Sequence, residues 1–92
     1  MLDPEERAQE LRNLPNWSYE DNAIVRSFAF PDFVGAMVFV NRVADMAEQV
    51  GHHPDIDIRY NRVRIALSTH SAGGVTAADI SLARQIAALI PD

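Results

Sequence analysis

Apolar residues recur at helical spacing between positions 33 and 50, and this segment is the strongest helix that the sequence predicts. Pro31 and Asp32 precede it as a start signal, and Gly51 follows it as a stop in the left-handed conformation. The apolar stripe consists of Phe33, Ala36, Met37, Val40, Val43, Ala44, Ala47 and Val50. Four more apolar residues lie off this stripe, namely Val34, Val38, Phe39 and Met46. We therefore expect one face of the helix to pack on a sheet and the other to meet a partner chain.

Alternating apolar and polar residues predict strands on both sides of this helix. After the helix, residues 55–60 and 63–68 alternate with period two and meet at a tight turn at Asn61. Before it, a short strand over residues 17–19 and a β-branched and aromatic run over residues 23–30 are separated by an Asp-Asn turn signal. Each pair forms a predicted hairpin. In the last strand, one parity is apolar and is expected to face the core: Val63, Ile65 and Leu67.

Two shorter helices are predicted near the ends of the chain. The first begins at Asp3-Pro4-Glu5-Glu6 and ends before Pro15. The second begins at a capping box, Thr76-Ala77-Ala78-Asp79, and runs to about Ile90. The residues Ser71-Ala72-Gly73-Gly74 before it predict a flexible loop. This order of elements predicts one α+β domain over residues 1–92, with an antiparallel sheet and helices on one face.

The composition excludes several functional classes. The chain has 92 residues, a net charge of -5 and no cysteine, and all eight of its basic residues are arginine. Direct nucleic-acid binding is not expected because no basic stripe is present. Disulfides, thiolate catalysis and cysteine-based zinc sites are excluded. The acidic start predicts no signal peptide, and no stretch is apolar enough to span a membrane, so we expect a cytoplasmic protein. A domain of this size gains stability by self-association, and an oligomer is expected.

All three histidines fall near one end of the second predicted hairpin. His52 and His53 lie just before its first strand, and His70 lies at the end of its second strand. Antiparallel pairing places these two ends beside each other, so the three side chains are expected to lie close together. His70 has the parity of the solvent-facing residues, which indicates that it is accessible.

Three readings of this histidine cluster stay open on the residues alone. Imidazole titrates near neutral pH, so a pair could give and take protons in catalysis. Three imidazoles could also hold a zinc ion, although adjacent histidines on an extended segment point in different directions. The third reading is a purely structural role. Nearby, Glu48 and Asp79 could orient a histidine, while Asp79 is also explained as the acid of the capping box. Trp17 suits either the core or an aromatic wall for a flat ligand.

The candidate functional residues are separated by defined numbers of residues along the sequence. The pattern is Glu48, three residues, His52-His53-Pro54, five residues, Tyr60, nine residues, His70, eight residues and Asp79. Further matching segments are Leu14-Pro15-Asn16-Trp17, Phe28-Ala29-Phe30, Asp32-Phe33, Ser68-Thr69-His70 and Gly73-Gly74. From about Leu11 to Ala87, the chain resembles the pterin-4a-carbinolamine dehydratase family in these residues.

The resemblance implies a fold, an activity and an assembly. The implied fold is a four-stranded antiparallel sheet with three helices on one side. The implied activity is the dehydration of 4a-hydroxytetrahydropterin to quinonoid dihydropterin, a step of tetrahydropterin recycling, with the pterin as substrate and neither a cofactor nor a metal. Family members form homodimers or homotetramers. Because some also act as dimerisation cofactors or assembly factors, the resemblance leaves a second hypothesis, a protein-interaction module on the same fold.

The resemblance also implies roles for individual residues. His52 and His70 would form the acid–base pair, and His53 would mainly bind the pterin. Glu48 and Asp79 would orient or tune the histidines. The substrate-contacting residues would include Trp17, Pro54, Ser68, Thr69 and Ser71. Two positions depart from the family: Ser71 stands where an acidic residue is frequent, and Ile56 stands where some relatives carry a large aromatic residue.

Overall fold

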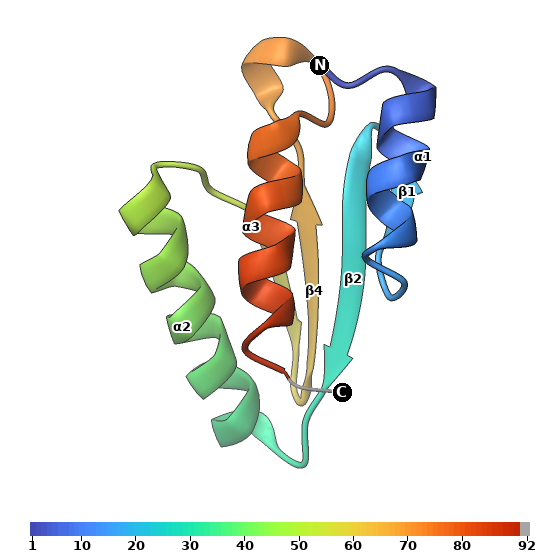
Figure 1. Cartoon of the computed structure of the whole chain (residues 1–92). Coiled ribbons are helices and arrows are strands. Elements are labelled where there is room, and N and C mark those ends of the chain that lie inside the picture. Colours follow the sequence, from blue (N-terminus) through green and yellow to red (C-terminus); the bar gives the residue numbers. More distant parts are fainter. Residues whose placement is uncertain (91–92) are drawn as a thin grey trace.

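A four-stranded antiparallel sheet carries three helices on one of its faces, as the sequence predicts (Figure 1). The structure is a computed structural model and describes residues 1–90. The helices are α1 (Pro4–Arg12), α2 (Phe33–Val50) and α3 (Ala77–Ala87). The strands are β1 (Ser18–Glu20), β2 (Ala23–Ala29), β3 (Asp55–Arg59) and β4 (Arg62–Leu67), and a short 3-10 helix, η1 (His70–Ala72), follows β4.

The two predicted hairpins lie side by side, so that the strand order is β1-β2-β4-β3. Strands β2 and β4 form the centre of the sheet and pair Ile24 with Leu67 and Phe28 with Val63. The first hairpin turns at Asp21 and Asn22, whose φ angles of 50° and 66° match the two-residue turns that suit the twist of a hairpin. This central pairing joins residues from both halves of the chain into one sheet.

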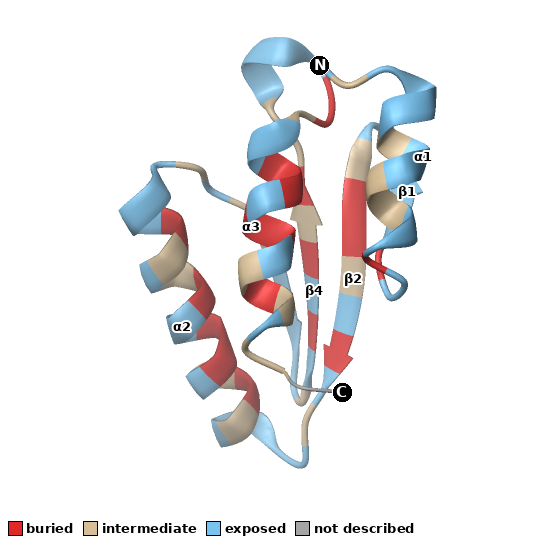
Figure 2. Cartoon of the chain, in the orientation of Figure 1, coloured by how far each residue is buried: buried red, intermediate tan, exposed pale blue. Residues whose placement is uncertain are grey.

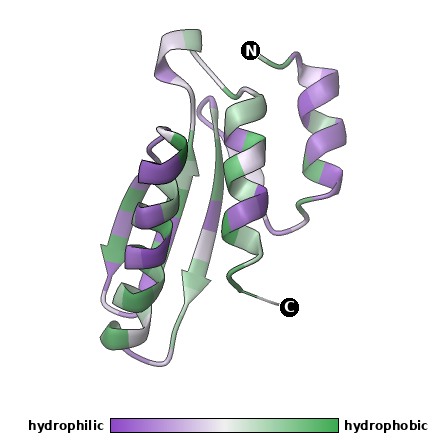
Figure 3. Cartoon of the chain, turned by 60° about the vertical axis from the view of Figure 1, so that its left-hand side comes forward, coloured by the Kyte–Doolittle hydropathy of each residue, from purple (hydrophilic) through white to green (hydrophobic). Residues whose placement is uncertain are grey.

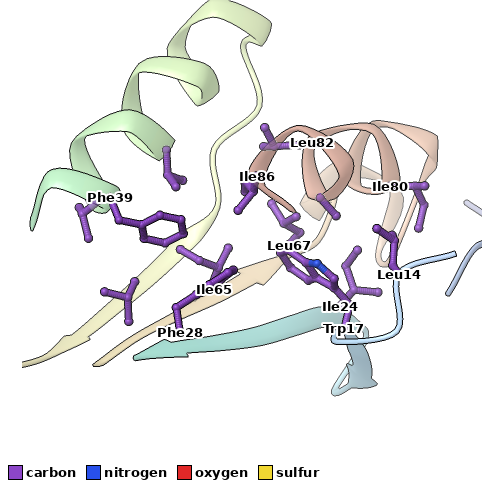
Figure 4. Packing of buried hydrophobic residues seen from close by; sticks show 14 of the residues in the cluster. Leu14, Trp17, Ile24, Phe28, Phe39, Ile65, Leu67, Ile80, Leu82 and Ile86 are labelled. Carbon is purple, nitrogen blue, oxygen red and sulfur yellow. The ribbon is translucent and has the colours of Figure 1, made fainter. Parts of the chain in front are cut away.

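The core lies between the sheet and the helices. Burial follows stripes along α2, α3 and the central strands (Figure 2). Val63, Ile65 and Leu67 are fully buried, which confirms the parity predicted for this strand. Figure 4 shows α3 residues such as Leu82 and Ile86 above these strands, with Phe39 of α2 beside them. Within residues 1–90, no helix is long and apolar enough to cross a membrane.

The ends of α2 follow the predicted signals. The Asp32 side chain accepts a hydrogen bond from the backbone N–H of Gly35 at 2.8 Å and so caps the first turn. Gly51 ends the helix in the left-handed conformation with a φ of 66°, as expected. The next backbone N–H, that of His52, donates to the carbonyl of Ala47 at 3.1 Å. This bond is the one that closes a Schellman ending, and it fixes where the chain leaves α2.

Three local expectations need correction. The segment 71–74 is not a simple flexible loop, because η1 covers its first part and Thr69 pairs with Gly74 in an isolated bridge. Strand β4 ends at Leu67, so strand parity does not extend to His70; that residue is exposed because it begins η1. Helix α3 ends at Ala87, ahead of the predicted end near Ile90, because the backbone N–H groups of Leu89 and Ile90 bond to carbonyls only three residues back.

Candidate functional site

His52 makes the central contact of the candidate site. Its ring nitrogen Nε2 lies 2.5 Å from Oδ1 of Asp79, at the start of α3. Asp79 is completely buried, whereas 18% of the His52 side chain is exposed. Within residues 1–90, Nδ1 of His52 has no hydrogen-bond partner. One ring nitrogen is therefore held by a buried carboxylate, and the other makes no hydrogen bond within the described residues.

The second oxygen of the Asp79 carboxylate is also fully used. Oδ2 accepts hydrogen bonds from the backbone N–H of Thr76 and from the hydroxyl of Thr69, each at 2.8 Å. The hydroxyls of Thr69 and Thr76 lie 2.8 Å from each other. Thr76 is the N-cap of α3, so the predicted capping box is confirmed. A buried carboxylate needs such donors, because burial without them would carry a large desolvation penalty.

His53 points to a different carboxylate. Its Nε2 is hydrogen-bonded to Oε2 of Glu48, in the last turn of α2. Both side chains are largely exposed, at 62% and 76%. An exposed pair of this kind contributes little to stability. Its main effect is to restrict the orientation of the His53 ring, and adjacent histidines thus have separate carboxylate partners.

His70 is exposed at the start of η1, and its imidazole makes no hydrogen bond or ion pair within the described part of the chain. The residue before it, Thr69, donates to the carboxylate that holds His52. Asp79 therefore connects the segment that carries His70 with the segment that carries His52. The two segments lie close together, as predicted, because both bond to this carboxylate.

The other predicted site residues have different surroundings. Ser68 donates from its hydroxyl to the carbonyl of Asn22 at 3.1 Å, which ties the end of β4 to the first hairpin turn. Pro54 is half-buried, and Ser71 is exposed on η1. Trp17 is only 5% exposed and lies in the core, where its ring packs edge-on against Phe28 at a centroid distance of 6.4 Å. Its buried Nε1 has no hydrogen-bond partner within residues 1–90.

The sequence did not identify Thr76 as a residue of this site. The capping box accounted for both Thr76 and Asp79 as parts of a helix start, and Thr69 stood only among the ligand contacts. The signal that could have linked Asp79 to His52 is the acid of the capping box itself, since its second oxygen needs a donor from elsewhere once it is buried.

As for metal binding, no three His, Cys, Asp or Glu side chains within residues 1–90 are grouped as a metal ion would require.

Comparison with known proteins gives consistent matches over nearly the whole chain. The model of the family described as pterin 4 alpha carbinolamine dehydratase matches residues 1–89. A relative from Thermomicrobium roseum, provisionally named pterin-4-alpha-carbinolamine dehydratase, is 52% identical over 96% of this chain and 95% of its own length. A relative from Acidobacterium capsulatum with the same provisional name is 55% identical over 97% of each chain.

Two solved structures share the fold. A transcriptional coactivator/pterin dehydratase from Brucella melitensis superposes with a TM-score of 0.93 at 42% identity, covering 98% of each chain. A pterin dehydratase-like protein identified as a RuBisCO assembly factor superposes with a TM-score of 0.65 at 23% identity, over 79% of this chain and 84% of its own. The second match indicates the fold alone.

Proposed function

The chain belongs to the pterin 4 alpha carbinolamine dehydratase family, and on that premise we propose that it converts 4a-hydroxytetrahydropterin into quinonoid dihydropterin and water. The C4a–O bond and the N5–H bond break, and a C4a=N5 double bond forms. The 4a-hydroxyl leaves as water after it takes up a proton. The step needs one base and one acid, and it needs neither an oxidant nor a nucleophile. The observation that carries the proposal is the pair formed by His52 and buried Asp79, beside the segment that bears His70, whose imidazole has no partner within residues 1–90.

We assign His52 as the base that removes the N5 proton. Because Nε2 donates its hydrogen to the Asp79 carboxylate, the neutral ring carries its lone pair on Nδ1. Nδ1 can therefore accept a proton from the substrate. When it does so, the ring becomes an imidazolium, and the buried carboxylate 2.5 Å away balances the new positive charge. This arrangement stabilises His52 in both of its protonation states without moving the ring.

We assign His70 as the acid that protonates the departing 4a-oxygen. Its imidazole is exposed and has no partner within residues 1–90, so it can exchange protons with water between turnovers. After one turnover His52 carries a proton and His70 has lost one, and solvent restores both. Each of these proton transfers is worth about 10²–10⁴ in rate.

The remaining site residues would bind the pterin. His53, oriented by Glu48, would contact the ring system from the end of α2. The segments that carry the two catalytic histidines hold three further residues that would contact the pterin: Pro54, Ser68 and Ser71. Trp17 is buried in the core, so it would reach a ligand only from within the core.

We further propose that the chain works as a homodimer or homotetramer. Helix α2 leaves four large apolar side chains exposed in the single chain, and three of them lie in its first two turns: Phe33 at 48%, Val34 at 70% and Val38 at 50%, with Val50 at 48% at its other end. Figure 3 shows hydrophobic positions at the N-terminal end of this helix, among hydrophilic ones. Burial of these side chains against another copy would add to the stability of a domain this small.

An interaction module on the same fold is the second candidate function. The exposed apolar side chains of α2 favour it, and the description of the Brucella melitensis structure includes the words transcriptional coactivator. The feature that separates the two functions is the histidine set, since a module that only bound proteins would have no need of it. A folded protein with one defined partner and no turnover would favour this second function.

The test is the decay of freshly generated 4a-hydroxytetrahydropterin, followed by its absorbance with and without protein. We expect the wild-type chain to accelerate this decay over the rate in buffer. We expect the double variant His52→Ala, His70→Ala to lose nearly all of the acceleration while it keeps its far-UV circular dichroism spectrum. If the double variant and the wild-type chain accelerate the decay equally, the proposed function is wrong.

A further inference from the structure

We propose that the N-terminal cap of α3 positions His52, and that Thr69 and Thr76 are positioning residues that act on His52 through Asp79. The proposal rests on the proposed function, because it takes His52 as the base. It changes the role implied for Thr69 from a contact with the pterin to a support of the base. It also adds Thr76, which the sequence explains entirely as a helix cap.

The hydrogen atoms of this network can be assigned one by one. The Thr69 hydroxyl has one hydrogen, and it donates that hydrogen to Oδ2 of Asp79 at 2.8 Å. Thr76 must then be the donor in the 2.8 Å contact between the two hydroxyls, which is much shorter than the 3.5 Å contact from its hydroxyl to Oδ2 of Asp79. The Thr76 hydroxyl in turn accepts from the backbone N–H of Ala78 at 3.3 Å. The result is a chain in one direction, from Thr76 through Thr69 to the carboxylate, and such chains strengthen their members.

This chain fixes the orientation of the carboxylate. Two donors at 2.8 Å hold Oδ2 in place, one from the Thr76 backbone and one from Thr69. Since Asp79 is completely buried, water does not compete for either oxygen. With Oδ2 held, Oδ1 can point only toward His52. The helix cap thereby holds the carboxylate against Nε2 of His52, so that this nitrogen carries the hydrogen and Nδ1 is free to act as the base.

The hydroxyl of Thr69 is therefore not available to donate to the substrate. Its single hydrogen is used by Asp79, and its oxygen accepts from Thr76. A contact residue and a positioning residue differ in their kinetic effects. Loss of a uniform substrate contact raises KM with kcat unchanged, whereas loss of a group that supports the base lowers kcat.

Two readouts test the proposal in the full chain. The first is the split between KM and kcat for the variants Thr69→Val, Thr69→Ser, Thr76→Val and Thr76→Ser. The second is the tautomer of His52, observed by nitrogen-15 NMR of histidine-labelled protein and independent of turnover. The control is Asp3→Ala, which removes the capping box of α1 and touches no histidine.

We expect both valine variants to lower kcat and the serine variants to restore it, because serine keeps the hydroxyl. Thr69→Val should lower kcat by about tenfold, the effect of one hydrogen bond to a charged group, and Thr76→Val by less, since it acts one bond further away. The NMR spectrum should show hydrogen on Nε2 of His52 in the wild-type chain and a mixture of tautomers in Thr69→Val. Asp3→Ala should leave kcat and the tautomer unchanged.

Two results would overturn the proposal. One is an increase in KM for Thr69→Val with kcat unchanged, which would return Thr69 to the substrate contacts. The other is a His52 tautomer that is the same in all variants. If the wild-type chain shows no turnover, the proposed function fails, and the NMR comparison still decides whether the cap positions His52.

Discussion

Replacing Asp79 by asparagine should reverse the tautomer of His52 while leaving the fold intact. Asparagine has the same shape as aspartate but carries an oxygen on one side and an NH₂ group on the other. The two donors that now bond to Oδ2, the Thr76 backbone and the Thr69 hydroxyl, require an oxygen at that position. The NH₂ group is therefore forced to face His52. Because it can only donate, Nε2 must accept, and the ring hydrogen moves to Nδ1.

The expected loss of activity follows from this change. A ring that carries its hydrogen on Nδ1 cannot accept the substrate proton there, so the general-base contribution of about 10²–10⁴ in kcat should disappear. The expected loss of stability is small. Three charge-assisted hydrogen bonds become neutral ones, at about 1 kcal/mol each, and the removal of a buried charge offsets part of that loss. A domain with ordinary stability of about 5–15 kcal/mol remains folded.

The assay compares kcat for the dehydration with the free energy of unfolding in urea, for the wild-type chain and Asp79→Asn. Asp32→Asn is the matched control, because Asp32 is likewise an aspartate that caps a helix start, as the N-cap of α2, but within residues 1–90 its side chain bonds only to its own helix. We expect the control to keep its kcat. The reasoning is refuted if Asp79→Asn is folded and keeps kcat within about threefold of the wild type, since general-base catalysis is worth far more than that.

Four further predictions concern binding, stability, assembly and metal. Glu48→Gln should raise KM severalfold and change the unfolding free energy in urea by less than about 1 kcal/mol, as for other exposed pairs; an unchanged KM would speak against a binding role for His53. Ile65→Ala, at a fully buried position, should lower the unfolding free energy by about 2–5 kcal/mol, and a loss below 1 kcal/mol would mean that the core closes around the cavity. Val38→Asp should reduce the mass measured by light scattering to that of one chain, whereas an unchanged mass would place the interface elsewhere. Treatment with a chelator should leave kcat unchanged, and elemental analysis that found stoichiometric zinc, together with loss of activity on chelation, would contradict the metal-free reaction.

Local patterns in the sequence were sufficient for the elements and most of their ends. The parity of Val63, Ile65 and Leu67 identified the buried face of β4, because alternate side chains of a strand point to opposite sides of the sheet. Gly51 identified the end of α2, because glycine adopts the left-handed conformation without steric cost. These features depend on residues a few positions apart, and so a sequence displays them directly.

Segment 71–74 was harder to predict, because its conformation depends on a distant partner as well as on its own residues. Glycine and serine indicated a loop. The bridge between Thr69 and Gly74 closes that loop, and the backbone N–H of Leu2 bonds to the carbonyl of Val75 just after it. Neither contact has a signature in the local sequence.

The sequence by itself determined the helices, the strands and the position of the three histidines at one end of a hairpin. The role of Asp79 at His52 could be inferred only by resemblance, since the capping box already explained that aspartate from its neighbours. Only the tertiary structure decided that one oxygen of its carboxylate serves the helix cap while the other meets a ring 27 residues away in the chain. The physical reason is burial: once a carboxylate is removed from water, both of its oxygens need donors, and the fold decides which residues supply them.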